Sequence, residues 1–199
     1  MISAISKKLA NSLGTTLMTS AEQIEIYAYG LEIILGAVIK LILILFLALL
    51  LGTLDTTIIL FIFFALFRCF GGGAHLSTYP RCLVFGVCLI VGLGYLAQTT
   101  ISIHALIILS ALSLALNIFT CIKWVPAGTE KKYITEPFLR LRQKQKYFLV
   151  IIGWCLTLLL LIKLSLSTYG FAVLLGSFGA MLLILPSGYW LLNTIDNLC

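Results

Sequence analysis

The sequence predicts an all-α, polytopic membrane protein with about six transmembrane helices and an N-terminal amphipathic helix in the membrane interface. Of the 199 residues, 61% are hydrophobic and only 10% are charged, against roughly a quarter charged in soluble domains. Apolar runs recur at about the length that a helix needs to cross the hydrocarbon core. Basic residues gather in alternate connections between these runs. The predicted spans are residues 33–51, 57–70, 83–99, 103–122, 147–164 and 169–192.

A single membrane-embedded domain is expected over residues 1–199, because no polar stretch is long enough to fold as a separate soluble domain. The expected surroundings are the lipid bilayer. The positions of the basic residues explain the net charge of +6, so no nucleic acid is expected as a partner. The six cysteines form no CxxC pair, which argues against a disulfide framework or a zinc ribbon. No cofactor or metal is expected.

The N-terminal stretch, residues 1–20, has the pattern of an amphipathic helix. Lys7 and Lys8 fall on the side opposite to a row of apolar residues at helical spacing. Such a helix lies in the membrane interface with its apolar side toward the acyl chains. The apolar row consists of Ile2, Ile5, Leu9, Leu13 and Leu17.

The connections alternate between short loops with almost no charge and basic segments, of which residues 123–146 are the longest. By the positive-inside rule, the basic connections and both termini face the cytoplasm. Three charged residues fall outside this scheme: Glu32, Lys40 and Lys163. Polar groups inside spans favour an alternative function, a membrane transporter or channel.

Residues 68–82, at the cytoplasmic edge between two spans, hold the candidate chemistry. His75 and Cys82 are seven residues apart. A cysteine is a strong nucleophile as thiolate, and a neighbouring imidazole can take its proton. Pro80 favours a helix start at that position, which puts Cys82 in the first turn. The positive end of the helix dipole stabilises a thiolate there. His75 and Cys82 are therefore candidates for the base and the nucleophile of a cysteine peptidase.

Neighbouring residues have two interpretations each. Gly72 and Gly73 either direct their amides at a developing oxyanion or serve the geometry of a turn. Arg68 either binds a substrate carboxylate or anchors the end of a helix in the headgroup region. The segment contains no Asp, Glu or Asn, so a third catalytic residue cannot be identified.

Other cysteines offer competing chemistry on the same side of the membrane. Cys121 ends the fourth predicted span and is a rival nucleophile. A zinc site is the other alternative, although the spacing of its ligands matches no known pattern. Its four candidate ligands are Cys69, His75, Cys82 and Cys121.

At these residues the chain resembles the accessory gene regulator B (AgrB) family, membrane peptidases of Gram-positive quorum sensing. The family's core motif, Arg-x-x-x-Gly-Gly-x-His with a Cys seven positions on, reads Arg68, Gly72, Gly73, His75 and Cys82 here. Residues 25–32 and 126–132 resemble the stretch before the first span and the cytoplasmic loop motif. The chain departs from the family where Gly128 replaces a common Asp, Tyr133 a common Pro and Leu76 a usual Ala.

The resemblance implies a cysteine endopeptidase with Cys82 as nucleophile and His75 as general base. Its implied partner is a propeptide of the AgrD type. The enzyme would remove the C-terminal part through a Cys82 thioester and cyclise the remainder to a thiolactone or lactone. The resemblance also implies a homodimer in the cell membrane of a Gram-positive bacterium.

Overall fold

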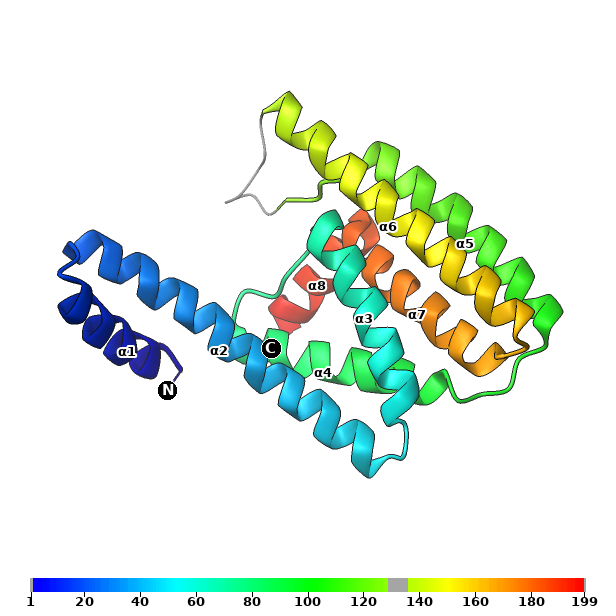
Figure 1. The fold of residues 1–199 in the computed structure, drawn as a ribbon, viewed down its shortest axis with the longest axis horizontal. Coiled ribbons are helices and arrows are strands. Elements are labelled where there is room, and N and C mark those ends of the chain that lie inside the picture. The colour runs from blue at the N-terminus through cyan, green and yellow to red at the C-terminus, as the bar shows by residue number, and fades with distance from the viewer. Residues whose placement is uncertain (1, 129–135, 199) are drawn as a thin grey trace. The chain divides into compact units, whose positions relative to one another are not determined.

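The computed structural model describes residues 2–128 and 136–198, and in these residues the secondary structure is helical apart from one isolated bridge (Figure 1). The helices are α1 (Ile2–Leu17), α2 (Ala21–Leu50), α3 (Leu54–Gly71), α4 (Tyr79–Leu96), α5 (Ile103–Lys123), α6 (Pro137–Lys163), α7 (Ser167–Ile184) and α8 (Pro186–Leu198). The all-α prediction is confirmed.

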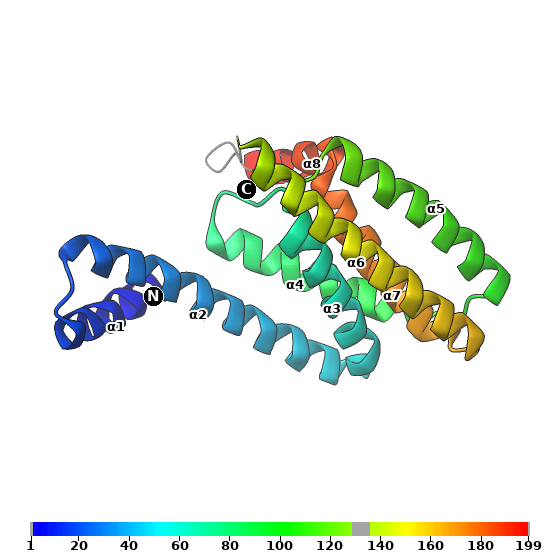
Figure 2. The ribbon, with the colours of Figure 1, turned by 45° about the horizontal axis from the view of Figure 1, so that its top comes forward.

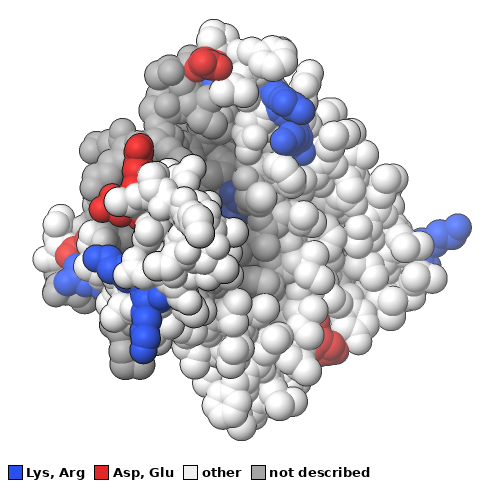
Figure 3. Space-filling view, turned by 60° about the vertical axis from the view of Figure 1, so that its left-hand side comes forward, with Lys and Arg blue, Asp and Glu red and all other residues white. Residues whose placement is uncertain are grey.

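Six of the described helices, α2 to α7, are long and apolar enough to cross a membrane. This confirms the expected multi-pass membrane protein. Charged side chains are sparse on the face drawn in Figure 3. Helix α3 has 18 residues, which corresponds to about 27 Å at 1.5 Å per residue. That is close to the ~30 Å hydrocarbon core, so α3 is about long enough to cross it.

One predicted span is wrong. The sixth span, residues 169–192, is two helices, because Pro186 interrupts it. A proline has no N–H to donate and favours extended backbone in the residue before it, and Leu185 is extended at φ −70° and ψ 153°. Helix α6 begins at Pro137, ten residues before the predicted fifth span, so the later part of the basic segment is the start of α6.

The chain forms two compact units, Met1–Phe46 and Leu47–Cys199, and α2 belongs partly to each. In the first unit the small residues Ser6, Ala10 and Gly14 form the buried face of α1. The predicted apolar row is largely exposed, for example Leu9 at 45%, as expected for a helix whose apolar side meets lipid. The interfacial location and the single domain stay predictions.

Helix α7 is the central helix of the second unit. Of its most apolar window, 72% is buried, against at most 28% for the other candidate spans. It contacts α3, α4, α5, α6 and α8, and Figure 2 shows α5, α6 and α7 running side by side. Small residues permit this close packing. An added Cβ at Gly176 would meet the Leu60 carbonyl oxygen of α3.

A buried aromatic cluster fixes the end of α3 that leads to the candidate site. Phe67 meets Tyr147 edge to face at 5.4 Å and Trp154 at 6.4 Å between ring centroids. The Tyr147 hydroxyl donates to Asn117 Oδ1 over 3.1 Å, and Trp154 Nε1 donates to the Val173 carbonyl oxygen over 3.2 Å. Both aromatic polar groups are therefore paired inside the core, and Phe67 places the next residue, which begins the site.

Candidate active site

The segment predicted to carry the chemistry begins where α3 ends, at a turn closed by a parallel bridge. Gly72 has φ 77°, a conformation that favours glycine. Gly73 N–H donates to the Ala127 carbonyl oxygen over 2.9 Å, and Ala127 N–H donates to the Gly71 carbonyl oxygen over 2.8 Å. A Cβ on Gly72 would meet that same Ala127 carbonyl oxygen. The segment that follows α5 is thus hydrogen-bonded, through Ala127, to the end of α3 and the turn that follows it.

Arg68, in the last helical turn of α3, stabilises the segment after α3 through hydrogen bonds from its guanidinium to backbone carbonyl groups. Its Nη1 donates to the Gly72 carbonyl oxygen over 2.8 Å, and its Nη2 donates to the Ala74 carbonyl oxygen over 2.9 Å. Nη2 also lies 3.1 Å from His75 Nε2. The Ala74 N–H donates to the Leu183 carbonyl oxygen of α7 over 2.8 Å. These contacts position His75 relative to both α3 and the central helix.

Cys82 lies in the first turn of α4, as predicted, with Pro80 in the same turn. The Cys82 N–H donates to the Thr78 carbonyl oxygen over 3.1 Å. Its Sγ lies 3.9 Å from His75 Nδ1. That distance is long for a hydrogen bond, but such catalytic contacts are often loose before substrate binds. Cys82 is half-buried and His75 is exposed, so a peptide can reach both side chains.

His75 has a different neighbour at each ring nitrogen. Nε2 lies 3.1 Å from Arg68 Nη2, and Nδ1 lies 3.9 Å from Cys82 Sγ. Nδ1 is therefore the ring nitrogen that is placed to exchange a proton with the Cys82 thiol.

Asp196 of α8 holds the segment between His75 and Cys82. Its Oδ2 accepts from the Ser77 N–H over 2.8 Å, and its Oδ1 accepts from the Ser77 hydroxyl over 3.0 Å. Arg81 Nη1 forms an ion pair with the same carboxylate at 3.3 Å. Desolvation opposes ionisation of Asp196, but hydrogen bonds from Ser77 and Arg81 outweigh it, so the pKa of the carboxyl lies below its ordinary value.

Sequence reasoning missed Asp196, because it searched for a carboxylate only within the segment itself. The signal available was that Asp196 is the only acidic residue after Glu136. A second contact from the same helix points the same way: the Tyr189 hydroxyl donates to the Gly128 carbonyl oxygen over 3.0 Å. Helix α8 therefore contacts both the segment of residues 68–82, through Asp196, and Gly128 of the predicted cytoplasmic loop motif, through Tyr189.

An apolar pocket of about 250 Å³ lies on the face of α4 that carries Cys82. Phe85 and Leu89 line it, and their spacing of three and seven residues from Cys82 puts all three on one helix face. Cys82 and Phe85 also pack against one buried cluster, Ala74, Leu76, Leu183 and Leu192. The other walls come from the end of α7 and the start of α8, including Leu183, Gly188 and Trp190.

The amides of the two glycines are already engaged. Gly72 N–H donates to the Arg68 carbonyl oxygen over 3.0 Å, and Gly73 N–H donates to Ala127. This favours the turn over the oxyanion interpretation, which stays a prediction. Arg68 likewise makes its observed contacts within the segment, and its binding of a substrate carboxylate stays a prediction.

The rival chemistry receives no support from the described residues. Cys121 is only 7% exposed, and its Sγ lies 3.8 Å from the Lys144 carbonyl oxygen. No group of three His, Cys, Asp or Glu side chains among the described residues is placed to hold a metal ion. Residues 129–135, with part of the predicted basic segment and the departure at Tyr133, lie outside the described residues.

The structure shows the surroundings of two of the charged residues that favoured the transporter alternative, Glu32 and Lys163. Glu32 lines a small cavity together with Lys7 and Tyr29, between α1 and α2. Lys163 is the last residue of α6, where a lysine can extend to the membrane surface. Neither setting requires a path through the membrane.

Comparisons with known proteins agree with the motif. Residues 6–187 match the family model described as Accessory gene regulator B. A curated relative, Putative AgrB-like protein 2 of Clostridium perfringens (strain 13 / Type A), is 24% identical over 149 residues, which covers 73% of this chain and 70% of the relative. No solved structure matches the chain.

Proposed function

The chain belongs to the accessory gene regulator B family, and from this membership and the geometry of two side chains we propose that it is a membrane cysteine endopeptidase acting on an AgrD-type propeptide. The family supports the general role, propeptide processing in quorum sensing. One observation carries the specific chemistry: Cys82 Sγ lies 3.9 Å from His75 Nδ1, with Arg68 on the other ring nitrogen.

The reaction divides into two acyl transfers. His75 Nδ1 takes the proton of the Cys82 thiol as general base, and the thiolate attacks the scissile carbonyl carbon. The C–N bond breaks as a thioester forms, and Nδ1 gives that proton to the leaving amine. A thiol or hydroxyl of the propeptide then gives its proton to Nδ1 and attacks the thioester. The ring product leaves, and the Cys82 sulfur takes the proton back from Nδ1.

Ring closure needs no ATP, because the thioester keeps the carbonyl activated until the second attack. Water competes with the propeptide nucleophile, so the acyl group must be sheltered. The apolar pocket beside Cys82 suits this need. Side chains three residues apart on a helix have Cβ atoms about 5–6 Å apart, so the residue that supplies the scissile carbonyl can place an apolar side chain against Phe85. Asp196 is a positioning residue that holds the start of α4.

The proposal locates the reaction at the cytoplasmic membrane surface. It retains the predicted topology, with both termini in the cytoplasm, and the predicted homodimer. Ala127, in the predicted basic segment, forms the bridge with Gly72 of the site. The positive charge of that segment attracts acidic parts of a peptide.

The test is propeptide cleavage in membranes that contain each variant. Cys82→Ala and His75→Ala each abolish cleavage while the protein still inserts, because each removes one side of the proton exchange. Cys88→Ala is the matched control, since Cys88 is an exposed cysteine on the same helix. Cleavage is followed by immunoblot of the propeptide. Retained cleavage in the Cys82 or His75 variant would refute the assigned pair.

A further inference from the structure

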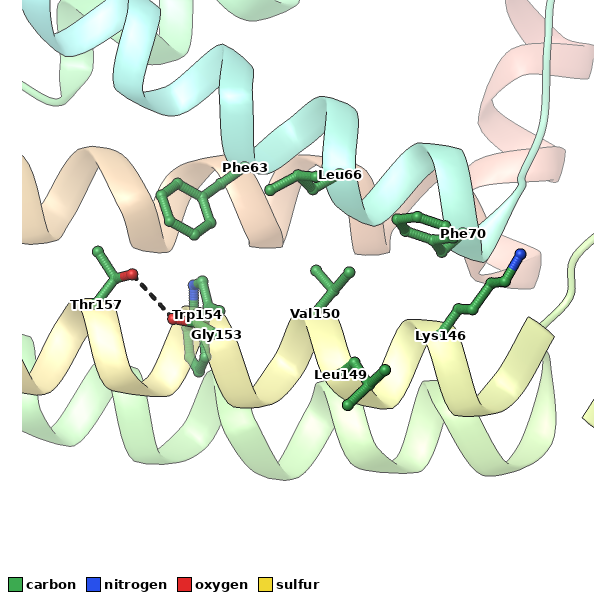
Figure 4. Close-up of a pocket in the computed structure, with 9 residues that line it drawn as sticks. All are labelled: Phe63, Leu66, Phe70, Lys146, Leu149, Val150, Gly153, Trp154 and Thr157. Carbon is green, nitrogen blue, oxygen red and sulfur yellow. Dashed lines mark hydrogen bonds between the residues drawn. The ribbon is translucent and has the colours of Figure 1, made fainter. Parts of the chain in front are cut away.

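A groove of about 550 Å³ between α3 and α6 is separate from the candidate active site. Figure 4 shows its two sides, with Phe63, Leu66 and Phe70 from α3 facing residues of α6. The Trp154 indole N–H donates to Val173, and the Thr157 hydroxyl donates to the Gly153 carbonyl oxygen. The polar atoms of these lining side chains are thus paired, and the surface offered to a ligand is apolar along most of its length.

One end of the groove carries a positive charge. Figure 4 shows Lys146 at the Phe70 end and Thr157 at the other. Lys146 is exposed, and in the described part of the chain its ammonium group forms no hydrogen bond or ion pair with another residue. It lies in the basic segment, so this end is the one expected at the cytoplasmic surface. An apolar channel with an ammonium at its mouth complements an amphiphile with an anionic head.

The length of the groove distinguishes a lipid from a helix. From Lys146 to Thr157, α6 rises by about 16 Å at 1.5 Å per residue. That is roughly half of the ~30 Å hydrocarbon core, the depth of one leaflet. A transmembrane helix from a partner would need a contact surface about twice as long as this groove. An acyl chain that starts at the headgroup level needs a surface only as long as the groove.

We propose that this groove is a binding site for an anionic phospholipid of the leaflet on the Lys146 side. One acyl chain lies between Phe63 and Leu66 of α3 and Val150 and Gly153 of α6. The phosphate pairs with the Lys146 ammonium. The groove is open at Gly153, where an added Cβ would meet nothing within 4 Å. The site is independent of the peptidase chemistry proposed above.

Two substitutions test separately the contact with the lipid phosphate and the contact with the acyl chain. Lys146→Gln removes the charge from an exposed position, and Gly153→Leu fills the groove from a position with open space. Gly92→Leu is the matched control for the second, since Gly92 is also an exposed helix glycine with nothing within 4 Å of an added Cβ. Each protein is purified from bilayers of phosphatidylcholine and phosphatidylglycerol, and the retained lipid is identified by native mass spectrometry.

The wild-type protein and Gly92→Leu retain phosphatidylglycerol in preference to phosphatidylcholine. Lys146→Gln loses about fivefold of that preference, the size of one lysine's attraction for an anionic lipid surface. Gly153→Leu retains neither lipid. Wild-type retention in both variants would overturn the proposal. So would a change of oligomeric state in Gly153→Leu without loss of lipid, because the groove would then be an interface between copies of this chain.

Discussion

The turn after α3 allows a sharp test, because Gly72 combines an unusual backbone conformation with a close neighbour. At φ 77° and ψ −144°, Gly72 occupies a region that other residues rarely adopt. Gly72→Ala must also move the Ala127 carbonyl oxygen, which an added Cβ would meet. The substitution therefore strains the backbone and disrupts the bridge at the same time.

The cost follows from these two effects. Backbone strain in such a region is about 1–3 kcal/mol for a non-glycine residue. The bridge consists of two hydrogen bonds, Gly73 to Ala127 and Ala127 to Gly71, each contributing about 0.5–1.5 kcal/mol. The total is about 2–6 kcal/mol, and even its lower end corresponds to roughly a 30-fold fall in the rate of cleavage, at about 1.4 kcal/mol per tenfold. The fall arises because Arg68 and His75 lose their alignment with Cys82.

The assay is initial-rate cleavage of a propeptide in membranes matched for protein amount. Gly92→Ala, a helix glycine with open space around it, is the control and keeps the wild-type rate. Membrane extraction of both variants confirms that each inserts. If Gly72→Ala cleaves within about threefold of wild type, the bridge does not hold the catalytic segment in the way described.

Three further results are expected. Because the pKa of Asp196 is lowered in the folded protein, its carboxylate stabilises the α8 contact above the ordinary carboxyl pKa, and this contribution is lost as pH falls through the lowered value. Limited proteolysis of α8 should therefore increase on acidification in wild type, whereas Asp196→Asn should be sensitive already at neutral pH; equal protection of the two proteins would contradict this. Phe85→Ala enlarges the apolar pocket. When propeptides compete, this variant should cleave those with a larger side chain at the residue that supplies the scissile carbonyl in preference to those with the native side chain. Val84→Ala, at an exposed position, is the control and leaves this preference unchanged. Tyr147→Phe leaves Asn117 Oδ1 without its donor and should cost about 0.6–1.7 kcal/mol, the range for hydrogen bonds between membrane helices; an unchanged thermal midpoint in detergent would show that the bond contributes nothing.

The sequence predicts the membrane helices well because each depends on a property of one continuous segment. An apolar run of sufficient length must satisfy its own backbone hydrogen bonds in lipid, so it forms a helix whatever its neighbours are. The same reasoning fails at Pro186, where the run of apolar residues continues although the helix does not. Hydropathy counts side chains, whereas the break depends on a missing N–H and on the backbone of Leu185.

The candidate pair is visible in the sequence because His75 and Cys82 belong to one short segment that begins a helix. Their supports are not visible in this way. Ala127, Leu183 and Asp196 contact the segment from three other parts of the chain. Contacts of this kind depend on how α5, α7 and α8 pack, and no local pattern encodes that packing.

The order of these supports along the chain has a consequence for biosynthesis. The ribosome adds His75 and Cys82 before it adds Leu183 and Asp196, whose carbonyl and carboxylate hold the segment between α3 and α4. Since chains are made from the N-terminus onward, a partly translated polypeptide holds both reactive groups without the framework that aligns them. The arrangement of His75 and Cys82 described above is thus complete only after α7 and α8 have been synthesised, and chains that stop before α7 hold the two side chains without these contacts.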